Sequence, residues 1–210
     1  MNFIEHSFRH ASSIFRNDEF GEVYDEIVSA IQGITDENLI SEHQQYGITD
    51  QAKIPKSISR AINNLLKVRL ESSGWNSESS IFQNPDYSGD RWRLDFAKAP
   101  FSVEVAFNHS TVIAWNLIKP VLAGELNHVQ KAIQTRGGII ICATQGMKDA
   151  GGFDSAIGTY EKFIEHLDPL RNLLTVPIMI IGLEAPETFM VEQFQLAPRK
   201  KIGRIVMLNN

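Results

Sequence analysis

Two uninterrupted apolar runs constrain the fold more than any other feature of this sequence. Residues 138–144 are GIIICAT and residues 177–183 are PIMIIGL. Runs of this kind are typical of strands buried on both faces, as in a parallel sheet covered by helices. The amphipathic stretch 155–174 between them is expected to be helical. The three segments therefore predict a strand–helix–strand unit with a right-handed parallel crossover.

Apolar residues at helical spacing predict three more helices, over residues 18–32, 57–73 and 120–133. The second of these ends before Gly74, a residue type that commonly follows the last turn of a helix. We expect the third to begin with Pro120 in its first turn, where proline is tolerated. The polar, Gln-rich segment 36–53 is interpreted as a loop or mobile segment.

Alternating apolar and polar residues predict two strands, 91–96 and 101–107, joined as a hairpin through residues 97–100. One further strand is expected within 189–208. The predicted elements place the chain in the α/β class, with a mixed central β-sheet flanked by helices.

The length of 210 residues is sufficient for one domain. We expect its core at about 55–185, a helical N-terminal part at 1–54 and C-terminal strands at 186–210. The single cysteine, Cys142, excludes an internal disulfide and a zinc site built from several thiolates.

No apolar run reaches the ~18 residues of a membrane span, and the first residues lack the apolar region of a secretory signal. We therefore expect a cytoplasmic protein with no membrane partner. The formal net charge of −5 argues against a protein that coats DNA without sequence preference. It does not exclude a protein that binds DNA in one local cleft.

Two carboxylates lie where the predicted hairpin brings its strands together. Asp95 and Glu104 stand among apolar neighbours in consecutive strands, so a short hairpin places both side chains at the same end of the sheet. An acid in such surroundings is costly unless it is paired or holds a metal ion. Two converging carboxylates suit Mg²⁺, which can polarise a phosphodiester and lower the pKa of an attacking water. The alternation is equally typical of a strand with one solvated face, and spacing alone leaves both interpretations open.

The surroundings of these acids resemble a known nuclease core. LDF, VEVAFNH, a following helix and GIIICAT stand in the order of the PD-(D/E)xK nucleases. More narrowly, the segment is similar to the BglII/BstYI group of type II restriction endonucleases. The helix ending LESSGW and the strand VPIMIIGL also fit this group. The resemblance covers about residues 55–185 and implies a restriction-endonuclease-like (PD-(D/E)xK) core.

The resemblance implies a metal site. Asp95 and Glu104 match the two metal-binding acids of the group, and the backbone carbonyl of Val105 is implied to complete the ligand shell. The implied cofactor is Mg²⁺, with Mn²⁺ able to substitute for it.

One position departs from the pattern of the group. Ala106 stands where the group carries lysine, glutamine or glutamate, and a methyl group can neither bind a metal ion nor move a proton. Candidates to replace it are Glu125 on the following helix, Glu78 upstream, Lys98 in the hairpin and His109 just past the strand. Otherwise water and the metal ions act unaided, or the chain binds DNA but cuts it poorly.

Three residues after the second acid are candidates for DNA binding. Asn108 and His109 match positions that carry base-contacting polar residues in the group, and both residue types can bond to base edges. They are equally well suited to cap the next helix. Lys119 can contact a phosphate or be a solvated helix residue.

The resemblance implies a Mg²⁺-dependent type II restriction endonuclease that cuts both strands of a short palindromic duplex, related to GATC, and leaves 5′-phosphate ends. A palindrome is two-fold symmetric, so a homodimer with one active site per strand is expected. Trp115, Leu122 and Leu126 are candidates for its interface or for the core. A DNA methyltransferase in the same cell is the implied partner.

Two alternatives remain open at this point. One is a structure-selective repair or recombination nuclease of the same fold. The other is a catalytically impaired DNA-binding protein, for which Ala106 is the strongest argument. A regulatory α/β domain unrelated to DNA is a weaker third interpretation.

Overall fold

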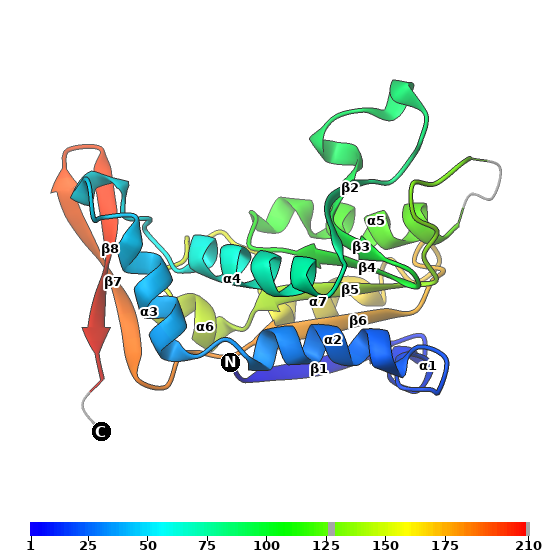
Figure 1. The fold of residues 1–210 in the computed structure, drawn as a ribbon, viewed down its shortest axis with the longest axis horizontal. Coiled ribbons are helices and arrows are strands. Elements are labelled where there is room, and N and C mark those ends of the chain that lie inside the picture. Colours follow the sequence, from blue (N-terminus) through cyan, green and yellow to red (C-terminus); the bar gives the residue numbers. More distant parts are fainter. Residues whose placement is uncertain (126–128, 209–210) are drawn as a thin grey trace.

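A six-stranded sheet forms the centre of the molecule in the computed structural model, which describes residues 1–125 and 129–208. Its strands lie in the order β1, β6, β5, β4, β3, β2 (Figure 1). Their bounds are β1 Phe3–Phe8, β2 Asn76–Ser80, β3 Arg93–Lys98, β4 Phe101–Val105, β5 Gly137–Ala143 and β6 Ile178–Leu183. β4, β5 and β6 are parallel, while β1, β3 and β2 pair antiparallel with their neighbours. The predicted class, α/β with a mixed central sheet, is confirmed.

The two apolar runs of the sequence are β5 and β6, and they pair in parallel as predicted, with Ile140 opposite Ile180. Every residue of both strands is buried. Apolar side chains on both faces of these strands can be buried because helices cover both sides of the sheet.

The helices divide between the two faces. Their bounds are α1 Ala11–Phe15, α2 Gly21–Gln32, α3 Asp36–Gln45, α4 Ser59–Ser72, α5 Ile113–Gly124, α6 Gln145–Ala150 and α7 Tyr160–Leu167. Buried side chains of α1 to α4 share a cluster with Ile139, Ile141 and Val103. Those of α5 and α7 share a second cluster with Ile140 and Cys142. Within the described ranges, none of these helices has the length and apolar character needed to cross a membrane.

The predicted hairpin is confirmed. β3 and β4 pair antiparallel, with Phe96 opposite Val103 and Lys98 opposite Phe101. The turn between them contains Pro100, whose peptide bond is cis. β4 continues the sheet through its parallel pairing with β5, so the hairpin is part of the central sheet.

The N-terminal part differs from the helical segment expected for 1–54. β1 pairs antiparallel with β6, so the sheet extends beyond the core boundaries of 55–185. The loop expected over 36–53 is also wrong in its first part, because α3 occupies Asp36–Gln45. Thr35 begins this helix by accepting a hydrogen bond from the backbone of Asn38, whose side chain accepts one in return from the Thr35 backbone.

The helix expected over 120–133 begins and ends earlier than predicted. α5 is Ile113–Gly124 and carries Pro120 in its interior. Residues 126–128, which the prediction included, lie outside the described residues, and Lys131 beyond them forms an isolated bridge with Phe82. The Pro120 ring packs on β5 at Gly138, where an added Cβ would lie 2.3 Å from the Pro120 Cβ. This close approach is the physical reason for glycine at position 138.

The helix expected over 155–174 is shorter than predicted. α7 covers only Tyr160–Leu167. Residues before it use their backbone groups elsewhere, as in the bond from the Gly158 N–H to the Asn108 carbonyl. Pro169 follows closely after the helix, and proline disfavours helical geometry in the residue that precedes it.

The C-terminal part contains two strands, of which the alternation within 189–208 had indicated one. β7 is Phe189–Ala197 and β8 is Lys200–Met207, and they form a separate two-stranded sheet. Figure 1 shows this hairpin in orange and red at one end of the molecule, away from α1. The basic group 199–204 therefore begins at its turn and continues along β8.

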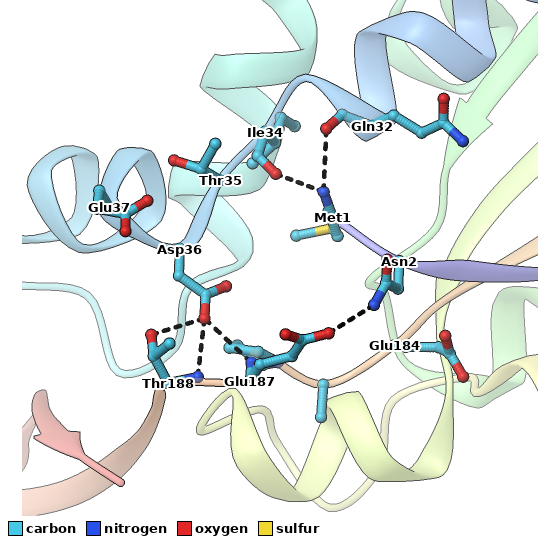
Figure 2. A pocket seen from close by; sticks show the side chains of 12 residues that line it. Met1, Asn2, Gln32, Ile34, Thr35, Asp36, Glu37, Glu184, Glu187 and Thr188 are labelled. Atoms are coloured by element: carbon cyan, nitrogen blue, oxygen red, sulfur yellow. Dashed lines mark hydrogen bonds between the residues drawn. The ribbon is translucent and has the colours of Figure 1, made fainter. Parts of the chain in front are cut away.

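A cluster of polar contacts fastens the link between β6 and β7 to the start of α3 (Figure 2). Asp36 Oδ2 accepts hydrogen bonds from the backbone N–H groups of Glu187 and Thr188 and from the Thr188 hydroxyl, at 3.0, 2.9 and 2.7 Å. The Asn2 amide donates to Glu187 Oε1 at 2.8 Å. The surrounding pocket therefore joins three separate segments of the chain.

Candidate active site

Asp95 and Glu104 meet across the β3–β4 hairpin. Phe96 pairs with Val103, so the next position along the same register sets Asp95 opposite Glu104. Side chains of directly opposite residues lie on the same face of a sheet. The sequence prediction that these two acids share one place in the fold agrees with this geometry.

Glu104 is buried on the face of the sheet that α5 covers. Its residue is only 2% exposed, which excludes the interpretation of a solvated strand face. Oε2 accepts a hydrogen bond from Lys119 Nζ of α5 at 2.7 Å. Oε1 is buried and has no hydrogen-bond partner among the described residues. Buried polar atoms without partners are uncommon in folded proteins, so this oxygen marks a place where a ligand fits.

Asp95 is half-buried and is tied to the neighbouring strand. Its Oδ2 accepts a hydrogen bond from the Val105 backbone N–H at 2.6 Å. Val105 follows Glu104 directly, so one bond fixes the first acid beside the second. Because Oδ2 has this partner, Oδ1 is the oxygen of Asp95 that is available to bind a ligand, as judged from the hydrogen bonds of the described residues.

The electrostatic surroundings of both acids oppose their ionisation. Desolvation is the main cause that raises the pKa of Asp95, and the Val105 N–H and Lys119 oppose it. Desolvation and the negative charge of Asp95 raise the pKa of Glu104 to about 8, while Lys119 again opposes the rise. A cation bound at the two acids would favour their ionised forms and so oppose these shifts.

Both acids line one cavity of about 360 Å³ with Lys119 and Asn108. Asn63, Asn64 and Lys67 of α4 also line this cavity. These three residues are not among the site residues predicted from the sequence. The only signal for them was their place on the polar side of a predicted helix, and a polar helix face is usually just solvated.

Glu78, one of the candidates for the missing function at Ala106, lies in this cavity. Ser77 and Ser79 of β2 pair with the residues on either side of Asp95, which places Glu78 opposite Asp95 on the next strand. Its φ of 50° is unusual for a residue other than glycine. Strain of this kind is often kept at functional sites.

The three acids thus follow one another across β2, β3 and β4. Within residues 1–125 and 129–208, no three His, Cys, Asp or Glu side chains already lie close enough to hold a metal ion together. Glu78 is exposed, so its side chain has more freedom to move than those of Asp95 and Glu104.

The other candidates for the function missing at Ala106 lie outside this cavity. Glu125 is exposed and follows the last residue of α5. Lys98 donates to Glu26 Oε1 and Oε2 at 2.7 and 2.8 Å and to the Ser73 carbonyl. Neither residue lines the cavity that holds Asp95 and Glu104.

The candidate DNA-binding residues have different surroundings. His109 caps a short 3₁₀ helix over Ser110–Val112, where its Nδ1 accepts a hydrogen bond from the Thr111 N–H at 3.2 Å. The capping interpretation therefore describes His109 in this structure. Asn108 is exposed and lines the cavity. Lys119 is not the solvated helix residue that was considered, because it is 8% exposed and paired with Glu104.

The candidate interface residues lie on or near α5. Trp115 is half-buried and packs edge-on against Trp92, with ring centroids 5.5 Å apart. Leu122 packs against the small cluster around Phe82. Leu126 lies outside the described residues. These packing contacts do not test the predicted homodimer.

The chain matches a known family over most of its length. The family model described as "Restriction endonuclease BglII/BglIII" matches residues 3–183. The chain belongs to this family. It is thus a type II site-specific deoxyribonuclease, a hydrolase that binds DNA. The resemblance inferred from LDF, VEVAFNH and GIIICAT is confirmed. The match begins at residue 3 and so includes β1, which the resemblance over about 55–185 did not.

Two solved structures of BglII share the fold. BglII complexed with a DNA 16-mer has 19% sequence identity and a TM-score of 0.66, over 99% of this chain and 100% of that chain. Free BglII has 18% identity and a TM-score of 0.56 over the same shares. No curated protein matches the chain in a sequence search.

Proposed function

We propose that this BglII/BglIII-family endonuclease requires Mg²⁺ and cuts both strands of a short palindromic DNA duplex, leaving 5′-phosphate ends. The observation that carries the proposal is the Asp95–Glu104 pair, set opposite each other in a cavity and with a buried carboxylate oxygen left unpartnered. Restriction endonucleases need such acids at the phosphodiester that they cleave.

The residues present fit a divalent cation. Asp95 and Glu104 offer hard carboxylate oxygens, the ligands that Mg²⁺ prefers. The Val105 carbonyl is the third proposed ligand, and Val105 also lines the cavity. Mn²⁺ has similar ligand preferences and should substitute. When bound, the metal polarises the phosphate and acidifies the attacking water.

The protein's own groups position the reacting parts. The Val105 N–H holds the Asp95 carboxylate in place, and Lys119 holds that of Glu104. Asn108, on the rim of the cavity, is placed to reach a DNA base or its backbone. Hydrolysis forms a bond from a water oxygen to phosphorus and breaks the bond to the 3′ oxygen, so the phosphate stays on the 5′ end.

A palindromic site calls for a homodimer with one cavity on each strand. We propose a recognition sequence related to GATC on the resemblance to the BglII/BstYI group, and a cytoplasmic protein accompanied by a DNA methyltransferase that protects the same site.

A digest of phage DNA, prepared with and without adenine methylation, tests the proposal. In Mg²⁺ we expect discrete bands from at least one preparation, and the mapped ends give the site and the cut position. A smear would instead favour a structure-selective nuclease. Intact DNA in both preparations would contradict the proposed activity.

Variants of the two acids test the site. Asp95→Asn and Glu104→Gln should abolish cleavage, because each removes a carboxylate from the proposed metal site. Both should still shift the mapped duplex on a gel in Ca²⁺. The matched control is Glu125→Gln, an exposed glutamate outside the cavity, which should cut normally. Retained cleavage by either acid variant would contradict the assignment.

A second candidate function follows from Ala106. It is 2% exposed and packs with Ile113 and Leu117 of α5, so it contributes only an apolar contact beside Glu104. A protein that binds its site and does not cut it is the alternative. Specific binding in Ca²⁺ without turnover in Mg²⁺ or Mn²⁺ would establish this second function.

A further inference from the structure

Lys119 is a buried lysine whose ammonium group lies at the acids. The residue is 8% exposed, and its Nζ lies 2.7 Å from Glu104 Oε2. Burying an ion pair costs desolvation energy that its own attraction often does not repay. Stabilisation of the folded protein is therefore a weak explanation for a charged lysine at this point of α5.

The ammonium group has more hydrogen-bonding capacity than Glu104 uses. It carries three N–H donors, and Glu104 Oε2 is the acceptor found for it within the described residues. Lys119 also lines the cavity that holds Asp95 and Glu104. Its remaining donors are thus available to a group that enters this cavity.

A small residue stands near Glu104 on the face of the sheet that α5 covers. Side chains alternate along a strand, so Ala106 follows Glu104 on the same face, about 6–7 Å further along. Ala106 belongs to the cluster formed with Ile113 and Leu117 of α5. Because a methyl group fills little of the space beside Glu104, a long side chain from the covering helix can lie there.

We propose that Lys119 is a catalytic residue that donates to Glu104 Oε2 and to a non-bridging oxygen of the scissile phosphate at the same time. It would orient the carboxylate and stabilise the negative charge that grows on the phosphoryl group during hydrolysis. This inference rests on the proposed function, because it places the scissile phosphate in the same cavity. Lys119 of α5 would thus supply the charged group that the methyl side chain of Ala106 cannot.

Salt dependence of DNA binding tests the contact without any cleavage. Each phosphate contact contributes about 0.9 to the slope of log affinity against log salt. Binding is measured in Ca²⁺ with the duplex mapped by the digest, or with a mixed-sequence duplex if the wild type does not cut. Lys119→Met should lower the slope by about one contact, and Lys119→Arg should retain it.

Lys98→Met is the matched control, since Lys98 is also a lysine paired with a glutamate, but outside the cavity. It should leave the slope unchanged. An unchanged slope in Lys119→Met would overturn the proposal, whatever the wild type does in Mg²⁺. Absence of cleavage by the wild type, with a reduced slope in Lys119→Met, would contradict the proposed function and the catalytic role that rests on it, and would support the phosphate contact of Lys119.

Single-turnover cleavage tests the catalytic part. Lys119→Met should slow cleavage at saturating protein and Mg²⁺ by about 10²–10³-fold, the usual effect of removing one group that stabilises the developing charge. Lys119→Arg should lose much less. Adding Ala106→Lys to Lys119→Met should restore part of the rate, because it returns an ammonium group to the same cavity.

A purely structural lysine predicts a different result. Lys119→Met would then unfold at a lower temperature but would cut at the wild-type rate when assayed well below its Tm. That outcome would overturn the catalytic role. If Lys119→Met does not fold, Lys119→Gln replaces it in both assays, because an amide keeps a hydrogen-bond donor but carries no positive charge. A salt slope and a cleavage rate equal to those of the wild type in Lys119→Gln would overturn the proposal.

Discussion

Glu104 should make the metal-free protein less stable as the pH rises, and Glu104→Gln should remove this dependence. Burial and the charge of Asp95 raise the pKa of Glu104 from its ordinary 4.5 to about 8. Between these values the folded protein keeps a proton that the unfolded chain has released. The stabilising contribution is thus complete below pH 4.5 and is lost as the pH rises through about 8.

The magnitude follows from the size of the pKa shift. A shift of one unit corresponds to about 1.4 kcal/mol, so the free energy of unfolding should fall by that amount per pH unit, and by at most about 5 kcal/mol over the interval. In a chain of this length, 1 kcal/mol changes Tm by about 2–4 °C. The contribution of Glu104 is therefore about 3–6 °C per pH unit.

The comparison of the wild type with Glu104→Gln depends on the charged groups around Glu104. Asp95 of β3 and Lys119 of α5 face it directly, and Glu78 of β2 acts on Asp95. All three stay in Glu104→Gln, and the glutamine oxygen can still accept from Lys119. The variant therefore removes the titrating carboxyl while keeping the hydrogen bond.

The assay is thermal unfolding with a chelator present, at intervals between about pH 5 and pH 8. The wild type should lose Tm across this range much more steeply than Glu104→Gln. Glu125→Gln, changed at an exposed site directly after α5, should follow the wild type. Mg²⁺ should raise the wild-type Tm most at the higher pH, because the ion competes with the proton. Equal slopes in wild type and Glu104→Gln would refute the reasoning.

Two further variants test other features of the fold and the site. Glu78→Gln should raise the Mg²⁺ concentration needed for half-maximal cleavage about tenfold, since it removes a carboxylate beside Asp95; an unchanged Mg²⁺ requirement would show that Glu78 takes no part. Gly138→Ala should lower the free energy of unfolding by about 1–3 kcal/mol, because its added Cβ would overlap the Pro120 ring. Thermal unfolding measures this loss, and Gly146→Ala is the control, since its Cβ meets only one atom, at 3.9 Å. Equal Tm values for the two alanine variants would contradict the packing argument.

The pairing of the two acids could be predicted because it depends on local sequence. A hairpin with a short turn fixes its own register, so Asp95 and Glu104 meet without any information about the rest of the fold. The two apolar strands could be predicted for a similar reason, because burial on both faces leaves a continuous run of apolar residues.

The partner of Glu104 could not be predicted in the same way. Lys119 reaches it from a covering helix, and the first turn of that helix was placed at Pro120 when it begins at Ile113. Proline in a helix interior costs about 3 kcal/mol on average, so sequence patterns favour it at a first turn. In this structure Pro120 lies in the interior of α5, where its ring packs on Gly138.

The edge strands were also beyond the reach of the sequence patterns. β2 is NSESS and offers little apolar periodicity, and β1 has charged and polar residues at three of its positions. Edge strands lie against one neighbour only, so burial constrains their composition less than that of β5 or β6. Glu78 was therefore named as a candidate without a strand to place it.

The hydrogen bond from the Val105 N–H to Asp95 has a mechanical consequence. The carboxylate of one strand is fastened to the backbone of the other, one residue from the second acid. Bending or sliding of β3 and β4 must carry both acids together, so their spacing should persist while loops that touch the bases rearrange. An enzyme built in this way can change the sequence it reads without readjusting the geometry with which it cuts.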